Sequence, residues 1–111
     1  MSLASEELAD RIRDAIGHLP FLTEQKMFGG RCFMLRGHML VAPMKDGNLL
    51  ARTGKDGYDD ALALPGAKPM IMGAKTMGGF VEVSGDVLED DDTLRDWITL
   101  SRNFVATLPD K

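Results

Sequence analysis

Four short, apolar-rich segments follow one another in residues 24–53, EQKMFGGRCFMLRGHMLVAPMKDGNLLART. Glycine-containing breaks separate them at Gly29-Gly30, Arg36-Gly37-His38 and Lys45-Asp46-Gly47. Because glycine supplies the positive φ angle that tight hairpin turns need, the last two breaks predict β-hairpins. Strands joined this closely must be antiparallel neighbours, so we expect four strands at residues 24–28, 31–36, 39–44 and 48–53.

Helical periodicity appears on both sides of this stretch. Leu8, Ile12 and Ile16 recur at helical spacing in a segment that we expect to begin at the N-cap Ser5 and to stop near Gly17. A final helix begins at the carboxylates of residues 90–92 and ends before Pro109. Its expected buried stripe consists of Leu94, Trp97, Ile98, Ser101, Phe104, Val105 and Leu108.

Further elements are expected between residues 55 and 84. Residues 55–64 predict a short helix that Pro65-Gly66 stops, and residues 69–73 and 79–84 predict two more strands. Residues 74–78, which glycines flank, are expected to form a mobile loop. The order α-β-β-β-β-α-β-β-α predicts an α+β domain of two layers, an antiparallel sheet with flanking helices.

Composition restricts the class of protein. The chain of 111 residues fits one domain, which we place at residues 1–111 with its core at residues 5–108. Its 44% hydrophobic and 27% charged residues exclude disorder of the whole chain. The single cysteine, Cys32, excludes an internal disulfide and a cysteine-based metal site. No apolar run could cross a membrane and the first residues do not form a signal peptide, so we expect a cytoplasmic protein with no membrane partner.

The charge of the chain is unevenly distributed. The net charge is −4, but residues 24–55 hold six cations and two carboxylates, a net charge of +4 that leaves −8 for the rest. Such a segment is either an ordinary solvated face or a basic surface that meets an acidic partner. Weak nucleic-acid binding through residues 24–55, with Phe28 or Phe33 stacking on bases, is the alternative function. The negative total argues against tight direct binding to DNA.

No residue pattern indicates catalysis or a bound metal. His18 and His38 lack the spacing of a metal-binding pair. Cys32 needs a base to act as a nucleophile; His38 is within reach across a hairpin, but a small buried position in a strand suits cysteine better. Gly29-Gly30 precedes a strand instead of a helix, so we interpret it as a bulge or tight reversal and not as a phosphate loop. We therefore expect no enzyme activity, no cofactor and no metal.

Seven methionines lie in or beside the predicted strands. They are Met27, Met34, Met39, Met44, Met70, Met72 and Met77. Methionine fills irregular cores, and it also lines adaptable protein-binding surfaces. We expect a core position for most of them, with Met77, in its predicted loop, as the exposed exception.

Several short motifs resemble one family when they are taken together. They are Lys26-Met27-Phe28-Gly29-Gly30, Leu49-Leu50-Ala51-Arg52, Lys75-Thr76-Met77 and a last helix that carries Trp97. This set resembles the TfoX N-terminal domain, which occurs in a bacterial competence regulator and in small stand-alone proteins. The resemblance extends over residues 6–108. Leu50 replaces an aromatic residue that is frequent in the family, and Gly78 replaces a lysine.

The resemblance implies a fold similar to type III secretion chaperones and to YgaC-like proteins. It implies a non-enzymatic module of transcription regulation that binds a protein partner, without the second, C-terminal domain of the full regulator. It also implies a homodimer that pairs through sheet or helix faces. The sheet edges could instead be protected in a monomer by strand charges and by Pro43, whose nitrogen should face solvent or a bulge.

The interaction residues that the family motifs suggest are Lys26, Met27, Phe28, Gly29, Gly30, Arg52, Lys75 and Met77. Two hypotheses apply to Arg52, which lies in an otherwise apolar strand. If its guanidinium turns inward, it must pair with backbone carbonyls or an acidic residue and support the sheet. If it is exposed beside Phe28, the two side chains form a patch that binds a partner.

Overall fold

The computed structural model describes residues 3–27, 30–44 and 46–109. It confirms the α+β class and the predicted order of elements. Three helices and six strands follow one another, with a short 3-10 helix, η1, before the last helix. Their bounds are α1 Leu3–Ile16, β1 Leu22–Met27, β2 Gly30–Leu35, β3 His38–Pro43, β4 Leu49–Arg52, α2 Tyr58–Leu62, β5 Ala67–Met72, β6 Lys75–Val83, η1 Val87–Glu89 and α3 Asp91–Val105.

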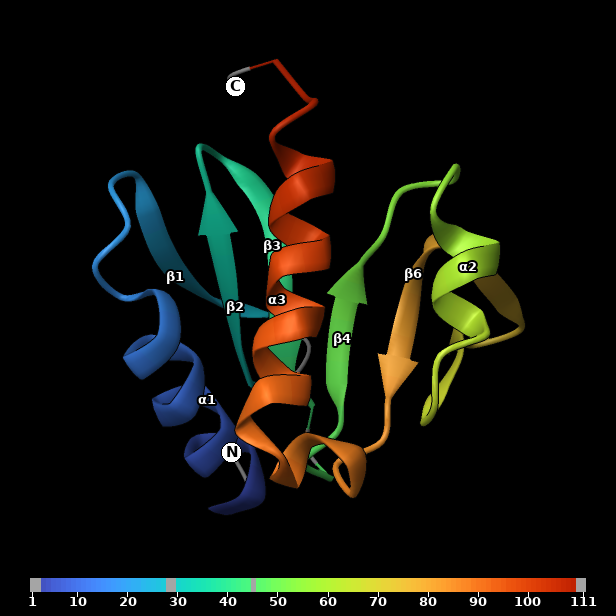
Figure 1. Ribbon diagram of the computed structural model, residues 1–111, viewed down its shortest axis with the longest axis horizontal. Coiled ribbons are helices and arrows are strands. Elements are labelled where there is room, and N and C mark those ends of the chain that lie inside the picture. The colour runs from blue at the N-terminus through green and yellow to red at the C-terminus, as the bar shows by residue number, and fades with distance from the viewer. Residues whose placement is uncertain (1–2, 28–29, 45, 110–111) are drawn as a thin grey trace.

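All six strands form one antiparallel sheet in the order β1-β2-β3-β4-β6-β5 (Figure 1). The first four strands are sequential neighbours, as the hairpin signals predict. At the Arg36-Gly37 turn both residues have positive φ angles, +52° and +83°, which match the twist of the strands that they join. The chain then passes through α2 before β5 and β6, so β4 pairs with β6 and β5 becomes the edge strand.

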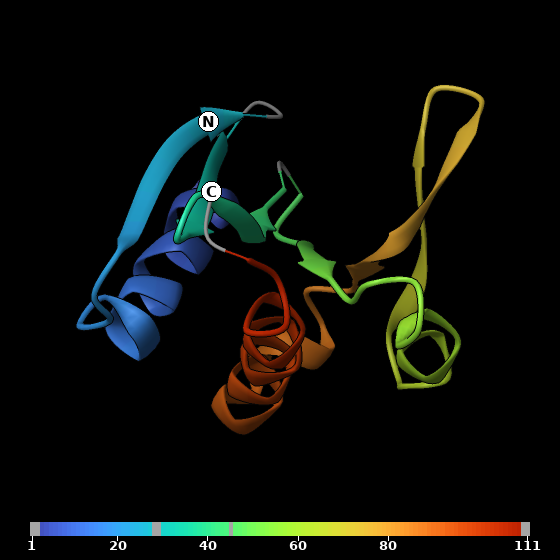
Figure 2. The same ribbon diagram turned by 90° about the horizontal axis from the view of Figure 1, so that it is seen from above.

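The helices pack on one face of the sheet. The main core joins residues of α1, α2, η1 and α3 to inward side chains of the strands, including Phe33, Leu49 and Val81. Figure 2 shows α1, α3 and α2 on one side of the sheet and the end of the β5–β6 hairpin projecting on the other. The domain therefore has two layers. No helix in the described part of the chain has the length and apolar character needed to cross a membrane.

The predicted helix faces are largely confirmed. Five residues of the α3 stripe are buried, while Phe104 and Leu108 are half-buried. Asp90 caps α3 by accepting a hydrogen bond from the Asp92 N–H at 2.9 Å. The prediction of Ser5 as the N-cap of α1 is wrong, because the helix already contains Leu3 and Ser5 is a buried residue within it.

Two boundaries between residues 55 and 84 also differ from the prediction. Residues 75–78 are not a loop but the first part of β6, because the chain reverses at Gly73 and Ala74 and Met72 pairs directly with Lys75. Gly73 has a φ angle of +60°, which allows this tight turn. The helix expected at residues 55–64 is shortened to Tyr58–Leu62, because residues 54–57 form turns and Gly57 offers no capping side chain.

Pro43 lies in a central strand where its missing donor is tolerated. The pairing of β2 with β3 ends at Phe33 and Val41, two residues before Pro43, and an irregularity in register precedes it at Phe33/Met34. On the other side, Met44 donates its N–H to the Asn48 carbonyl at 2.8 Å and closes the hairpin with β4. The nitrogen of Pro43 thus faces the side of β3 where the pairing with β2 has already ended, so no hydrogen bond is lost there, as expected.

Candidate functional site

The face of the sheet opposite the helices has a hydrophobic cluster of its own. We call it the helix-free face. Its buried residues are Cys32, Ala42, Leu50 and Met70, and the partly buried residues packed against them are Met34, Met39, Met44, Met77 and Phe80. All of these lie in strands or directly beside one, and within the described residues no helix side chain belongs to the cluster. Side chains alternate along each strand, so every strand that helps to form the main core also sends side chains to this face.

The prediction that most methionines are core residues is wrong for this face. Among the methionines whose side chains are described, Met70 is buried, whereas Met34, Met39, Met44 and Met77 are half-buried. Met72, with 39% of its surface exposed, is more exposed than Met77, because residue 77 belongs to β6 and packs onto the cluster. The side chain of Met27 lies outside the description. Thioether side chains therefore form much of the apolar part of the helix-free face, beside Glu82, which lies opposite Leu50 and pairs with Lys68.

Arg52 lies at the end of β4, on the same side as Leu50. Its guanidinium carbon is 5.7 Å from the centre of the Phe80 ring and 5.4 Å from that of Phe104. One guanidinium N–H donates to the Met39 carbonyl in a long bond of 3.4 Å. Contacts of this kind with two aromatic rings stabilise a cation without neutralising it. Among the described residues no carboxylate pairs with Arg52, so its charge and most of its five N–H donors face a hollow.

This hollow has a volume of about 640 Å³ and connects the end of β4 with β6 and the end of α3. Lys55 and Asp56 also line it, so Arg52 and Lys55 outnumber the single carboxylate. Gly54 gives the hollow its shape: its φ angle is +73°, and a Cβ atom there would lie within 2.3 Å of the Phe104 ring. The arrangement suits an anionic group that approaches along the sheet, such as a carboxylate, which arginine binds through paired hydrogen bonds.

The structure brings together some of the predicted site residues and separates others. Met77 belongs to the helix-free face, where Lys75 is exposed two residues before it in β6. Arg52 lies at the end of β4 between Phe80 of this face and Phe104 of α3. The β1–β2 hairpin, where Met27 pairs with Gly30, is separated from β4 by β3. Lys26 is exposed on that hairpin, opposite Arg31. Phe28 and Gly29 lie outside the described residues, so the hypothesis that Phe28 adjoins Arg52 stays a prediction.

The sulfur and imidazole groups lie in different parts of the fold. Cys32 is fully buried on the helix-free face, where its Sγ lies 3.6 Å from the Met34 Sδ, and burial raises the pKa of the thiol to about 11. His38 is on the other side, where its Nε2 lies 2.6 Å from the Pro109 carbonyl oxygen. Cys32 therefore has no base in His38 and remains protonated near neutral pH. Within residues 3–27, 30–44 and 46–109, no group of His, Cys, Asp or Glu side chains is placed to hold a metal.

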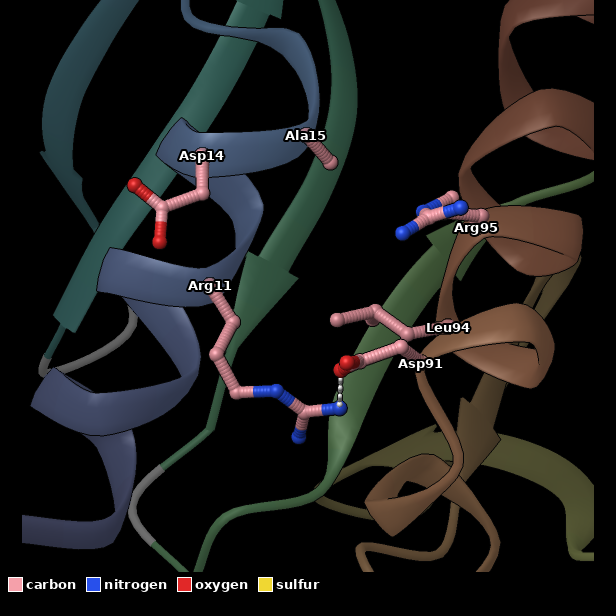
Figure 3. A pocket seen from close by; sticks show the side chains of 6 residues that line it. All are labelled: Arg11, Asp14, Ala15, Asp91, Leu94 and Arg95. Atoms are coloured by element: carbon pink, nitrogen blue, oxygen red, sulfur yellow. Dashed lines mark hydrogen bonds and ion pairs between the residues drawn. The ribbon is translucent and has the colours of Figure 1, made fainter.

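The charged residues that line a polar hollow between α1 and α3 include an ion pair that links the two helices (Figure 3). Arg11 of α1 forms an ion pair with Asp91 of α3 at 2.8 Å, and it also donates to the Leu88 carbonyl. Asp14 points away from Arg95 in this view. Because Arg11 and Asp91 link the two helices and Arg95 pairs with Asp92 within α3, we regard this hollow as structural.

Sequence reasoning missed Phe80 and Phe104 as the neighbours of Arg52. Phe80 reaches it because β4 pairs with β6, which places Arg52 directly opposite Phe80. Phe104 reaches it from α3, where it was assigned to the buried stripe. One sequence signal for a close neighbour was Gly54, two residues after Arg52. In the structure a side chain at position 54 would collide with the Phe104 ring.

Comparison with protein families gives one result that covers the whole sheet. Residues 14–105 match the TfoX N-terminal domain, a range that begins near the end of α1 and finishes at the last residue of α3. No curated protein matches the chain closely enough to add a relative to this comparison. All six strands, α2, the helix-free face and Arg52 lie inside the matched range. Because the match covers most of the sequence, the chain belongs to the TfoX N-terminal domain family.

Proposed function

We propose that this domain is a non-enzymatic protein-interaction module of a bacterial regulatory system in the cytoplasm, and that its partner binds on the helix-free face. The observation that supports this most strongly is the asymmetry of the sheet. Helices cover one face, whereas on the other face methionine side chains and Phe80 pack as a partly exposed apolar cluster. Methionine is unbranched and polarizable, so such a surface can adapt to a partner of irregular shape. Family membership supports a competence-regulator-like role.

The chemistry of this face favours one type of partner segment. Its centre is apolar, and Arg52, with Lys55 nearby, provides positive charge at one end. A segment that carries apolar side chains for the methionines and one carboxylate for Arg52 would complement both features. The two N–H groups on one edge of a guanidinium fit the two oxygens of a carboxylate.

The nucleic-acid alternative has weaker support. The cations of residues 24–55 are dispersed: Arg31 pairs with Glu24 at 3.4 Å, Arg36 donates to the Val105 carbonyl at 3.1 Å, and Arg52 lies beside two phenylalanine rings. A backbone-binding protein needs its cations along one groove or stripe. We therefore propose that any binding to nucleic acid is weak and sensitive to salt.

Site-specific photo-crosslinking in cells tests the proposed face. A photoreactive residue replaces Met44 on the helix-free face, and a matched variant carries it at Glu7, which is exposed on α1. We expect a discrete protein adduct from position 44 alone, and its loss when Arg52→Ala is added. Equal adducts from both positions, or adducts that a nuclease removes, would overturn the proposal.

A further inference from the structure

Phe21 has an unusual backbone conformation and an unusual exposure. Its φ angle is +64°, and 75% of its surface is exposed. A bulky side chain in the left-handed region is disfavoured, and an exposed ring gains little burial to offset that cost. The Phe21 carbonyl accepts a hydrogen bond from the Arg36 N–H at 3.1 Å, which ties it to the β2–β3 turn. The fold thus holds an aromatic ring in solvent at some energetic cost, which is a feature typical of functional positions.

The surroundings of Phe21 are apolar and positively charged. It borders a hollow of about 480 Å³ beside α3, with Leu19, Leu35 and Ala106 among its apolar residues. Arg102 provides positive charge, and Arg36, whose guanidinium donates to the Val105 carbonyl, also lines the hollow; among the described residues no carboxylate lines it. Within the described part of the chain, Arg102 forms no ion pair. Exposed aromatic rings beside arginines are the residue types that dominate binding hot spots.

The other flank of α3 carries the complementary surface. A groove of about 530 Å³ lies between η1, the segment after α2, and α3. Leu64, Val87, Trp97 and Leu100 form its apolar lining, and Leu64 is 42% exposed. Its charged lining residues are all carboxylates: Asp86, Asp90 and Asp96. Figure 1 places β1, which follows Phe21, and α2, which precedes this groove, on opposite sides of α3.

We propose that Phe21 of one copy of this chain docks into the Trp97 groove of a second copy. Arg102 would then face the carboxylates of Asp86 and Asp96, and the Phe21 ring would lie against Leu64 and Val87 in the groove. Each surface supplies what the other lacks: an apolar knob beside a cation, and an apolar groove with a rim of carboxylates. Apolar contact and complementary charges both favour this seating over a random contact.

This contact is heterologous, because each copy contributes one knob and one groove from different flanks of α3. Such contacts produce open chains or closed rings and not a simple two-fold pair. The inference does not use the helix-free face, so it is independent of the proposed function. Because charges contribute, we expect the association to weaken as the ionic strength rises.

Sedimentation equilibrium of the purified full chain tests the contact with two variants. Phe21→Gly removes the knob and suits the positive φ angle, so its melting temperature should not fall. Asp96→Arg reverses a charge on the rim of the groove. For the wild-type chain we expect the average mass to rise above that of a monomer between about 10 μM and about 1 mM. Each variant should associate at least tenfold more weakly.

Mixing the two variants provides the sharpest readout. Phe21→Gly keeps an intact groove and Asp96→Arg keeps an intact knob, so an equimolar mixture should form a 1:1 pair that cannot grow further. The matched controls Ile71→Ser, an exposed apolar residue of β5, and Asp14→Arg, an exposed carboxylate of α1, should associate like the wild type. A wild-type chain that stays monomeric at about 1 mM, a mixture that forms no pair, or a loss of association in Ile71→Ser would overturn the proposal.

Discussion

The two faces of the sheet differ in the residues that they use and in how these residues are covered. Under the helices the strands contribute branched and aromatic side chains that are fully buried: Phe33, Leu40, Val41, Leu49, Val81 and Val83. On the helix-free face the same strands contribute four buried residues and, around them, the half-buried side chains of four methionines and Phe80. Branched side chains have few rotamers and specify one packing, whereas methionine accepts several. We infer that the covered face determines stability and that the helix-free face is free to serve binding.

Truncation on each face should give the largest effect and the clearest contrast. Phe33→Ala removes a fully buried ring under α1 and α3, and we expect a loss of about 3–5 kcal/mol in the free energy of unfolding. Met34→Ala, the next residue along β2, removes a side chain that water already reaches, and we expect a loss of about 1 kcal/mol. Urea denaturation of both variants measures the difference. Equal losses would show that the helix-free face is a second core.

The hairpin meander and α3 were predictable because their signals are local. Gly37 identified the β2–β3 turn, and the periodicity of Leu94, Trp97 and Val105 identified the buried side of α3. Side chains alternate along each strand, but this alternation alone does not determine which set the helices cover, because that depends on how segments distant in sequence pack together.

The candidate site depended on such distant contacts. Arg52 stood out as a cation in an apolar strand, but Phe80 comes from a strand that pairs with β4 only after α2 and β5 have intervened. Phe104 approaches from the last helix, and its helical spacing indicated burial in the core. The start of β6 was missed because the glycines that flank residues 74–78 indicated a loop, although backbone pairing with β5 keeps this segment extended.

The thiol of Cys32 reports whether the helix-free face is closed in the free protein. Burial raises its pKa from 9.0 to about 11, so the folded state favours the neutral thiol. The stability that comes from keeping this thiol neutral is fully present below pH 9 and is lost as the pH rises through 11. The total loss in the free energy of unfolding is about 2–3 kcal/mol. At pH 8 we expect alkylation of the native thiol to be much slower than in urea, because it requires opening of the structure. Rapid native labelling would show that this face is open to solvent.

Substitution of Arg52 distinguishes a supporting residue from a binding residue. Its cation contacts with Phe80 and Phe104 and its long bond to the Met39 carbonyl are not a buried ion pair. We therefore expect Arg52→Ala to lower the free energy of unfolding by about 1–2 kcal/mol, less than the roughly 3 kcal/mol that loss of a buried pair would give.

Thermal denaturation measures the stability of the Arg52 variants, and partner crosslinking from position 44 measures their binding. Arg52→Lys keeps the charge but not the planar fork, so it should retain stability better than binding. A variant that changes neither property would exclude both hypotheses for this residue.

The smallest expected effect lies at the sheet edge, where β1 meets α1. Arg13 donates to both oxygens of Glu24, at 2.8 and 2.9 Å, and Arg31 approaches the same carboxylate at 3.4 Å. The hydrogen bonds from Arg13, followed by the charges of Arg13 and Arg31, hold the pKa of Glu24 below its ordinary value of 4.5.

A lowered pKa means that the Glu24 carboxylate stabilises the fold at a pH above its pKa in the unfolded chain. This stabilisation is lost as the pH falls through its pKa in the folded chain. Because these side chains are partly exposed, we expect Glu24→Gln to cost about 0.5–1 kcal/mol at pH 7 and progressively less as the pH falls through the pKa of the folded-state carboxylate. Chemical denaturation across this range, with Glu7→Gln as an exposed control that has no such partner among the described residues, measures the difference. A cost that stays constant with pH would mean that the Glu24 carboxylate contributes through packing and not through its charge.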